Sequence, residues 1–88
     1  MAAVGVQNKG AYTVDFNLII DKKLVKSFTD VPVNKFNTFI VDNDADWTIQ
    51  ADLDQPFDDS NASRTISGKG DAYLVTTGTT CKWNFQRR

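Results

Sequence analysis

The sequence predicts a small all-β domain, an antiparallel β-sandwich of the Ig-like kind with about seven or eight short strands. Three observations support this fold class. Two segments alternate apolar and polar residues with period two, turn-forming residues recur about every ten positions, and no segment has a sustained helical period behind an N-cap.

The clearest strand signal spans residues 11–20, where alternate side chains are apolar: Tyr12, Val14, Phe16, Leu18 and Ile20. Residues 47–53 repeat this period, with Trp47 and Ile49 among the inward side chains. Weaker strand candidates, rich in β-branched or aromatic residues, are 3–7, 24–28, 36–41, 63–67, 72–76 and 80–85. In the last of these, Cys81 shares a face with Trp83 and Phe85, so we expect an inert thiol in the core.

With 88 residues the chain has room for one core, so we expect a single domain over residues 1–88. Its single cysteine allows no intramolecular disulfide, although small secreted domains usually carry several. The first residues have no signal-peptide pattern. We therefore expect a cytoplasmic protein; a secreted one, in mature form or released by a non-classical route, is the alternative.

Charge and composition argue against several classes of function. The net charge of −1 gives no general attraction to nucleic acid or to an anionic bilayer, so we expect no nucleic-acid partner. Histidine is absent, which removes the usual general base and the commonest metal ligand. One thiol without an imidazole cannot form a structural zinc site. We therefore expect no enzyme activity and no catalytic residues.

If every connection reverses the chain, the loops alternate between the two ends of the sandwich. Lys9 and residues 30–35, 54–61 and 77–79 would then share one end, and residues 21–23, 42–46, 68–71 and the terminal arginines the other. Binding sites on such scaffolds usually lie in the loops of one end. The first end carries our candidate binding residues, Asp30, Asn34, Lys35, Phe57, Asp58, Asp59 and Asn61.

Calcium is the one metal that the acidic loops could hold, since it prefers oxygen-rich sites. Residues 42–46 have an EF-hand-like start, but Trp47 occupies the position of the required glycine and begins a strand. In the longer loop, Asp54, Asp58 and Asp59 are candidate calcium ligands, and a solvated loop without metal is the other interpretation. We expect no other cofactor.

The chain also resembles Ig-like adhesion modules of the CARDB type over roughly its first 65 residues. The similar segments are Val6 to Gly10, the strand ending at Asp21-Lys22-Lys23, Val31-Pro32-Val33, Ala51 to Asp54 and Asp58 to Asn61. Those modules are sandwiches that bind or space rather than catalyse, so the resemblance implies such a role.

We therefore expect a binding module that recognises a protein or carbohydrate through the loops of one end. The alternative is a membrane-active or toxin-like small sandwich that acts as an oligomer, since a domain of this size gains from association and has exposed edge strands. A homo-oligomer is compatible with both interpretations, and a membrane partner only with the second.

Overall fold

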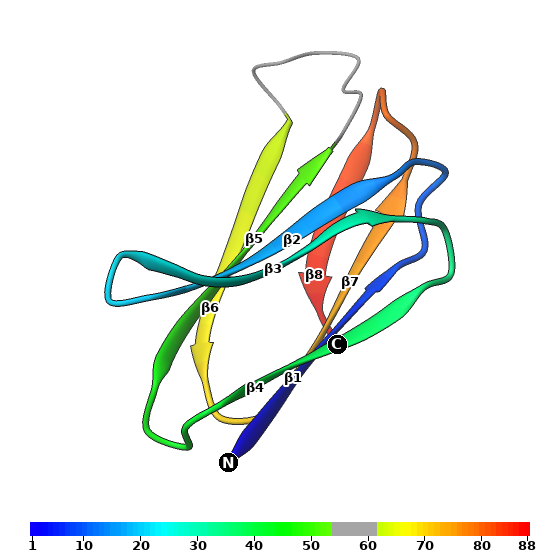
Figure 1. Cartoon of the computed structure of the whole chain (residues 1–88). Helices are drawn as coiled ribbons and strands as arrows, with labels where there is room; N and C mark the ends of the chain where they lie inside the picture. The colour runs from blue at the N-terminus through cyan, green and yellow to red at the C-terminus, as the bar shows by residue number, and fades with distance from the viewer. Residues whose placement is uncertain (54–61) are drawn as a thin grey trace.

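The computed structural model describes residues 1–53 and 62–88 and contains eight strands and no helix within them. The strands are β1 (Ala2–Asn8), β2 (Val14–Ile20), β3 (Lys23–Val31), β4 (Phe36–Val41), β5 (Asp46–Leu53), β6 (Ser63–Lys69), β7 (Ala72–Gly78) and β8 (Trp83–Arg87). They form a first sheet in the order β4-β1-β7-β8 and a second sheet in the order β3-β2-β5-β6. The predicted all-β sandwich is confirmed (Figure 1).

The direction of each strand follows from its number, because the chain reverses from one strand to the next. Five of the six described strand pairs join an odd-numbered to an even-numbered strand and are antiparallel. The pair β1–β7 joins two odd-numbered strands and is parallel, from Val4 opposite Ala72 to Asn8 opposite Thr76. The antiparallel β2–β5 pair also occurs in the constant-type Ig sandwich, but the remaining strand order differs from that fold.

The core lies between the two sheets and contains the inward side chains that period-two alternation predicts. Phe16 on β2 and Trp47 and Ile49 on β5 are fully buried. Across the sandwich, Phe16 packs on Phe85 with ring centroids 6.0 Å apart. Trp47 satisfies its ring N–H by donating a hydrogen bond of 2.9 Å to the carbonyl of Gly70. Large side chains from both sheets thus fill the interior without leaving this indole donor unpaired.

One core prediction is wrong. Cys81 is exposed, because β8 begins only at Trp83. Gly78 ends β7 with a positive φ of 94°, and Thr79 and Lys82 exchange backbone hydrogen bonds of 3.2 and 3.1 Å. This tight turn takes the residues between them out of the strand, so the alternation that buries Trp83 and Phe85 does not extend back to the cysteine.

Candidate binding site

Three connections meet at one end of the sandwich, as the alternating chain predicts. The amide of Asn8 donates to the carbonyl of Lys35 at 3.2 Å, which joins the end of β1 to the β3–β4 connection. The amides of Lys9 and Ala11 donate to the carbonyls of Thr76 and Gly78, which joins the β1–β2 connection to β7. We call this the loop end; it lies opposite the N-terminus (Figure 1).

The side chain of Asn8 holds the loop end together from inside. It is fully buried, and its amide nitrogen donates to the carbonyls of Tyr12 at 2.6 Å and Val31 at 3.0 Å. Its amide oxygen accepts from the Gly10 amide at 2.9 Å and the Thr76 hydroxyl at 3.0 Å. Every polar atom of this side chain is therefore paired, as burial requires, and one residue fixes three segments.

The end of β3 and the β3–β4 connection have an unusual backbone conformation beside this anchor. Asp30 and Asn34 have positive φ values of 53° and 71°, in the left-handed region that non-glycine residues seldom adopt. The Asp30 amide donates to the Asp15 carboxylate at 2.8 Å, and the Asn34 amide donates to the carbonyl of Asn8. Asp and Asn tolerate this region best, and these bonds hold both residues in it.

Three of the predicted binding residues are therefore brought together. Asp30, Asn34 and Lys35 lie in and beside this connection and are exposed. The other four, Phe57, Asp58, Asp59 and Asn61, lie outside the described residues, as does Asp54. The calcium ligand set proposed for Asp54, Asp58 and Asp59 thus falls wholly outside the described part of the chain.

Sequence reasoning missed apolar side chains beside this site. Val33, at the centre of the β3–β4 connection, is 52% exposed, and Phe36, the first residue of β4, is 48% exposed. The Phe36 ring packs on that of Tyr73 with centroids 5.8 Å apart, above Gly5 on the intervening strand β1. A Cβ on Gly5 would lie 2.7 Å from the Phe36 ring, so the glycine makes room for this pair. The Val31-Pro32-Val33 segment was a visible signal, whereas the Phe36–Tyr73 pair depends on sheet order.

The Tyr12 side chain adds a second anchor to the loop end. Its hydroxyl donates to the carbonyl of Thr77 at 2.8 Å, and its ring packs nearly perpendicular to that of Trp83 with centroids 6.1 Å apart. Burial raises the pKa of Tyr12 above its ordinary value, outweighing the opposing effects of the Thr76 hydrogen bond and the Arg64 charge. The phenol therefore stays neutral and donating through the physiological range.

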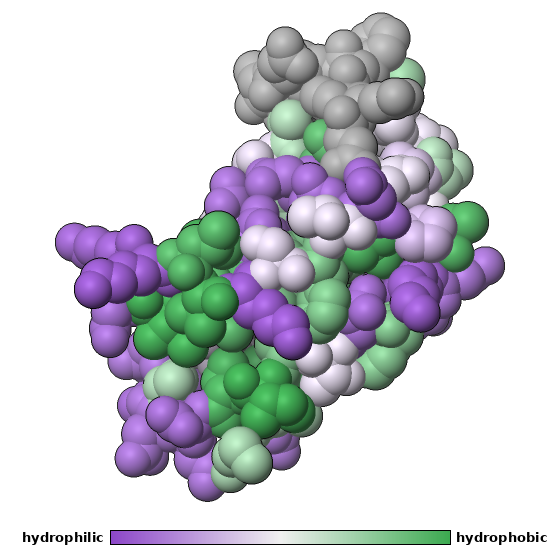
Figure 2. All heavy atoms as spheres, in the orientation of Figure 1, coloured by the Kyte–Doolittle hydropathy of each residue, from purple (hydrophilic) through white to green (hydrophobic). Residues whose placement is uncertain are grey.

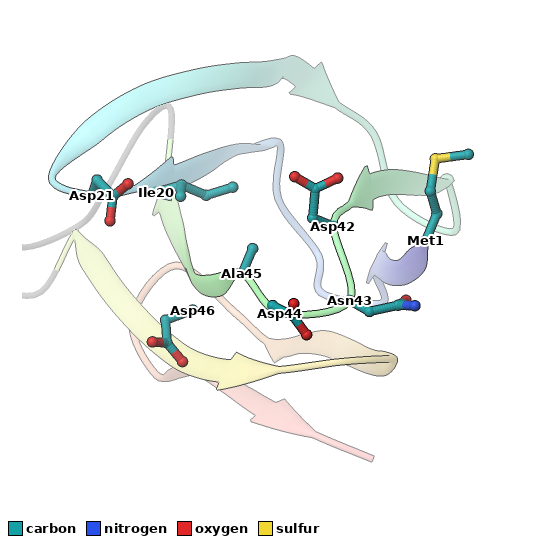
Figure 3. A pocket seen from close by; sticks show the side chains of 8 residues that line it. All are labelled: Met1, Ile20, Asp21, Asp42, Asn43, Asp44, Ala45 and Asp46. Atoms are coloured by element: carbon teal, nitrogen blue, oxygen red, sulfur yellow. The ribbon is translucent and has the colours of Figure 1, made fainter.

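The opposite end holds an acidic depression of about 620 Å³. It is lined by Met1, Ile20, Asp21, Asp42, Asn43, Asp44, Ala45 and Asp46. Figure 3 shows that the carboxylates of Asp21, Asp42, Asp44 and Asp46 point in different directions rather than toward one point. Within residues 1–53 and 62–88 no group of three or more acidic or cysteine side chains could hold a metal ion.

The β2–β3 hairpin, at this same opposite end, has an apolar and basic tip. Asp21 and Lys22 form its two-residue turn with φ values of 54° and 65°, as a type I′ turn requires. Leu24 is 64% and Val25 58% exposed, next to Lys22, Lys23 and Lys26. The hairpin extends sideways from the sandwich in Figure 1, and Figure 2 shows apolar surface beside its hydrophilic tip.

Comparison with known proteins identifies a fold neighbour but no family. No protein-family model matches the chain, and no curated protein matches it. Among solved structures, listeriolysin O matches with a TM-score of 0.64 and 13% sequence identity over 99% of this chain. The match covers 22% of the listeriolysin O chain, so this chain spans about one fifth of that protein. The described residues contain no helix, and therefore none that could cross a membrane. At this identity the likeness shows the sandwich fold alone.

Proposed function

We propose that this protein is a non-enzymatic binding module that recognises a protein or carbohydrate through its loop end. One observation carries the proposal: two exposed non-glycine residues, Asp30 near the end of β3 and Asn34 in the following connection, are held at positive φ beside the buried anchor Asn8. Backbone conformations of this kind cost about 1–3 kcal/mol and concentrate at ligand-binding sites.

The anchoring prepares the connection for binding. A loop that is already ordered loses less conformational entropy when it meets a ligand, so more of the contact energy appears as affinity. The end of β3 offers a carboxylate at Asp30, and the connection adds an amide at Asn34 and an ammonium at Lys35, with exposed Val33 between them. This combination of an apolar centre and polar surroundings is typical of protein and carbohydrate recognition.

The test is binding by the intact chain to a glycan array and to partners retained from a host extract, each followed by titration with the purified ligand. Asn34→Gly keeps the backbone conformation and removes the amide, and Val33→Ser removes the apolar centre. We expect each change to weaken binding about tenfold, which corresponds to about 1.4 kcal/mol. Lys69→Gln, at the opposite end, is the matched surface control and should leave the affinity unchanged.

The long loop is tested separately. Replacing Phe57 by Ala while neutralising Asp58 and Asp59 should also weaken binding, because these predicted residues belong to the same proposed site. Full affinity in this variant and in both β3–β4 variants would defeat the loop-end proposal.

A second candidate function is membrane activity, favoured by the β2–β3 hairpin. Exposed Leu24 and Val25 beside three lysines combine apolar and cationic groups in the way that interfacial membrane-binding elements do. The likeness to listeriolysin O, a lysin by its name, is compatible with this function. Vesicles of phosphatidylcholine with and without phosphatidylserine test it through dye leakage and light scattering. A protein inert toward both vesicles would eliminate the membrane candidate and leave the loop-end proposal intact.

A further inference from the structure

Strand β4 differs from the other edge strands of the sandwich. The described sheets have four edges, formed by β3, β4, β6 and β8. Strand β3 carries Lys23, Lys26 and Asp30 and two register shifts, while β6 and β8 each contain arginine. Strand β4, with the sequence FNTFIV, has no charge, proline or glycine and pairs with β1 in unbroken register. Charges, bulges and prolines are the features that prevent edge-to-edge pairing, and β4 lacks all of them.

The alternation of hydrogen bonds shows which backbone groups of β4 are free. The amide of Asn8 donates to the carbonyl of Lys35, so the even-numbered residues of β1 face β4. The odd-numbered residues face β7, as the Ala3 amide bonded to Asp71 and the Lys9 amide bonded to Thr76 show. The even-numbered residues of β1 pair with Asn37, Phe39 and Val41 of β4. The N–H and C=O groups of Phe36, Thr38 and Ile40 therefore point away from β1, along the open edge.

These same three residues carry the exposed side chains of the strand. Phe36 is 48% and Ile40 58% exposed, and Thr38 between them is also exposed. An antiparallel second copy of β4 that places Thr38 opposite Thr38 sets Phe36 opposite Ile40 on both sides of the two-fold axis. About six backbone hydrogen bonds would form in this register, and each apolar side chain would gain a cross-strand apolar neighbour.

The charges that flank β4 favour the same arrangement. Lys35 precedes the strand and Asp42 follows it. With Thr38 opposite Thr38, Lys35 lies opposite Val41 of the other copy and Asp42 lies opposite Asn34, so no like charges meet at either end. A parallel pair would instead place lysine beside lysine and aspartate beside aspartate, which destabilises cross-strand pairs. The flanking charges therefore oppose a parallel pair and are compatible with the antiparallel one.

We propose that the open edge of β4 binds β4 of a second copy of this chain, joining the two first sheets into one continuous sheet across a two-fold axis. The interface is isologous, as most dimer interfaces are. It leaves Asp30 and the hairpin tip free, and it borders the loop end at Asn34, Lys35 and Phe36, so dimerisation is measured without any ligand.

Sedimentation and light scattering of the intact chain over about 1 µM to 1 mM test the proposal. We expect a concentration-dependent monomer–dimer equilibrium. Thr38→Lys places two like charges together on the axis and should raise the dimer dissociation constant about tenfold or more, equivalent to about 1.4 kcal/mol. Asn84→Lys makes a comparable charge change at an exposed position on the opposite edge strand of the same sheet and is the matched control. Circular dichroism and thermal unfolding would verify that both variants fold.

A pair of opposite charges tests the orientation. Ile40→Lys alone should weaken the dimer, because in this register it removes the apolar cross-strand neighbour of Phe36 on both sides of the axis. Adding Phe36→Glu in the same chain places opposite charges across from each other on both sides of the axis and should recover part of the lost affinity, whereas a parallel pair would place like charges together. A protein that stays monomeric up to about 1 mM overturns the proposal, and so does a dimer that Thr38→Lys leaves unaffected. A dimer weakened by Ile40→Lys and not recovered in part by adding Phe36→Glu would overturn the antiparallel register.

Discussion

The buried amide of Asn8 accepts a hydrogen bond of 3.0 Å from the hydroxyl of Thr76, a residue 68 positions later in the chain. The two side chains face each other inside the sandwich where β1 and β7 run parallel, and both are fully buried. This contact closes the loop end, because the same amide also holds the β1–β2 connection and the end of β3.

Replacing Asn8 should destabilise the whole domain. Asn8→Ala leaves the Tyr12 and Val31 carbonyls and the Gly10 amide without their partner, so we expect a loss of about 2–4 kcal/mol in the free energy of unfolding. Asn8→Asp keeps the volume but points a carboxylate at two carbonyl oxygens, and should cost at least as much. Urea titration measures both. An alanine variant within about 0.5 kcal/mol of the parent would contradict the anchoring role.

Two glycines with positive φ form a matched pair for testing the turn that exposes Cys81. Gly78 has φ 94°, and a Cβ there would lie 2.3 Å from the carbonyl oxygen of Lys82, a backbone atom. Gly70 has φ 77° with open space around it. Gly70→Ala should therefore cost about 1–2 kcal/mol, the conformational penalty alone, and Gly78→Ala clearly more. Equal melting temperatures for the two variants would contradict this geometry.

Tyr12 predicts a loss of stability in alkali. Its folded-state pKa lies above the value of about 10 expected for the unfolded chain, because burial disfavours the phenolate. Its contribution is therefore fully present below about pH 10 and declines as the pH rises toward the folded-state pKa, since the unfolded state releases its proton first. Urea unfolding between about pH 8 and 11 measures this. Tyr12→Phe should be less stable at neutral pH and should lack this part of the alkaline decline.

The exposed position of Cys81 predicts labelling of the folded protein. A thiol-specific reagent should modify one thiol per chain without denaturant, since the side chain lies in the β7–β8 turn rather than in the core. Cys81→Ser should change the free energy of unfolding by less than about 0.5 kcal/mol, as surface substitutions usually do. If labelling required unfolding, the thiol would instead be buried in the core, as the residue pattern predicted.

Much of the fold could be predicted from local patterns. Alternation in residues 47–53 predicts the buried face of β5, including Trp47, and the candidate at 36–41 coincides with β4. The candidate at 80–85 was displaced to 83–87 because a turn closed by Thr79 and Lys82 interrupts the pattern. Alternation describes which face a side chain takes once a strand exists, but it does not mark the residue at which the strand begins.

The candidate site was only partly predictable. Turn chemistry placed Asn34 and Lys35 correctly in a loop at one end, but it placed Asp30 there too, whereas β3 extends through Asp30 to Val31. Phe36 and Tyr73 come together only because β4 and β7 flank β1 and Gly5 leaves room between them. Proximity of this kind depends on sheet order, which period-two patterns do not encode.

The sequence by itself determined the all-β class, the inward faces of the strands and the absence of histidine chemistry, because each is a local property of composition or period. Only the tertiary structure decided that β1 lies beside β7 in parallel and that Asn8 is the buried anchor of the loop end. It alone also decided that β4 is an open edge. The physical reason is that these features arise from contacts between segments far apart in the chain, which are selected by the packing of the whole core.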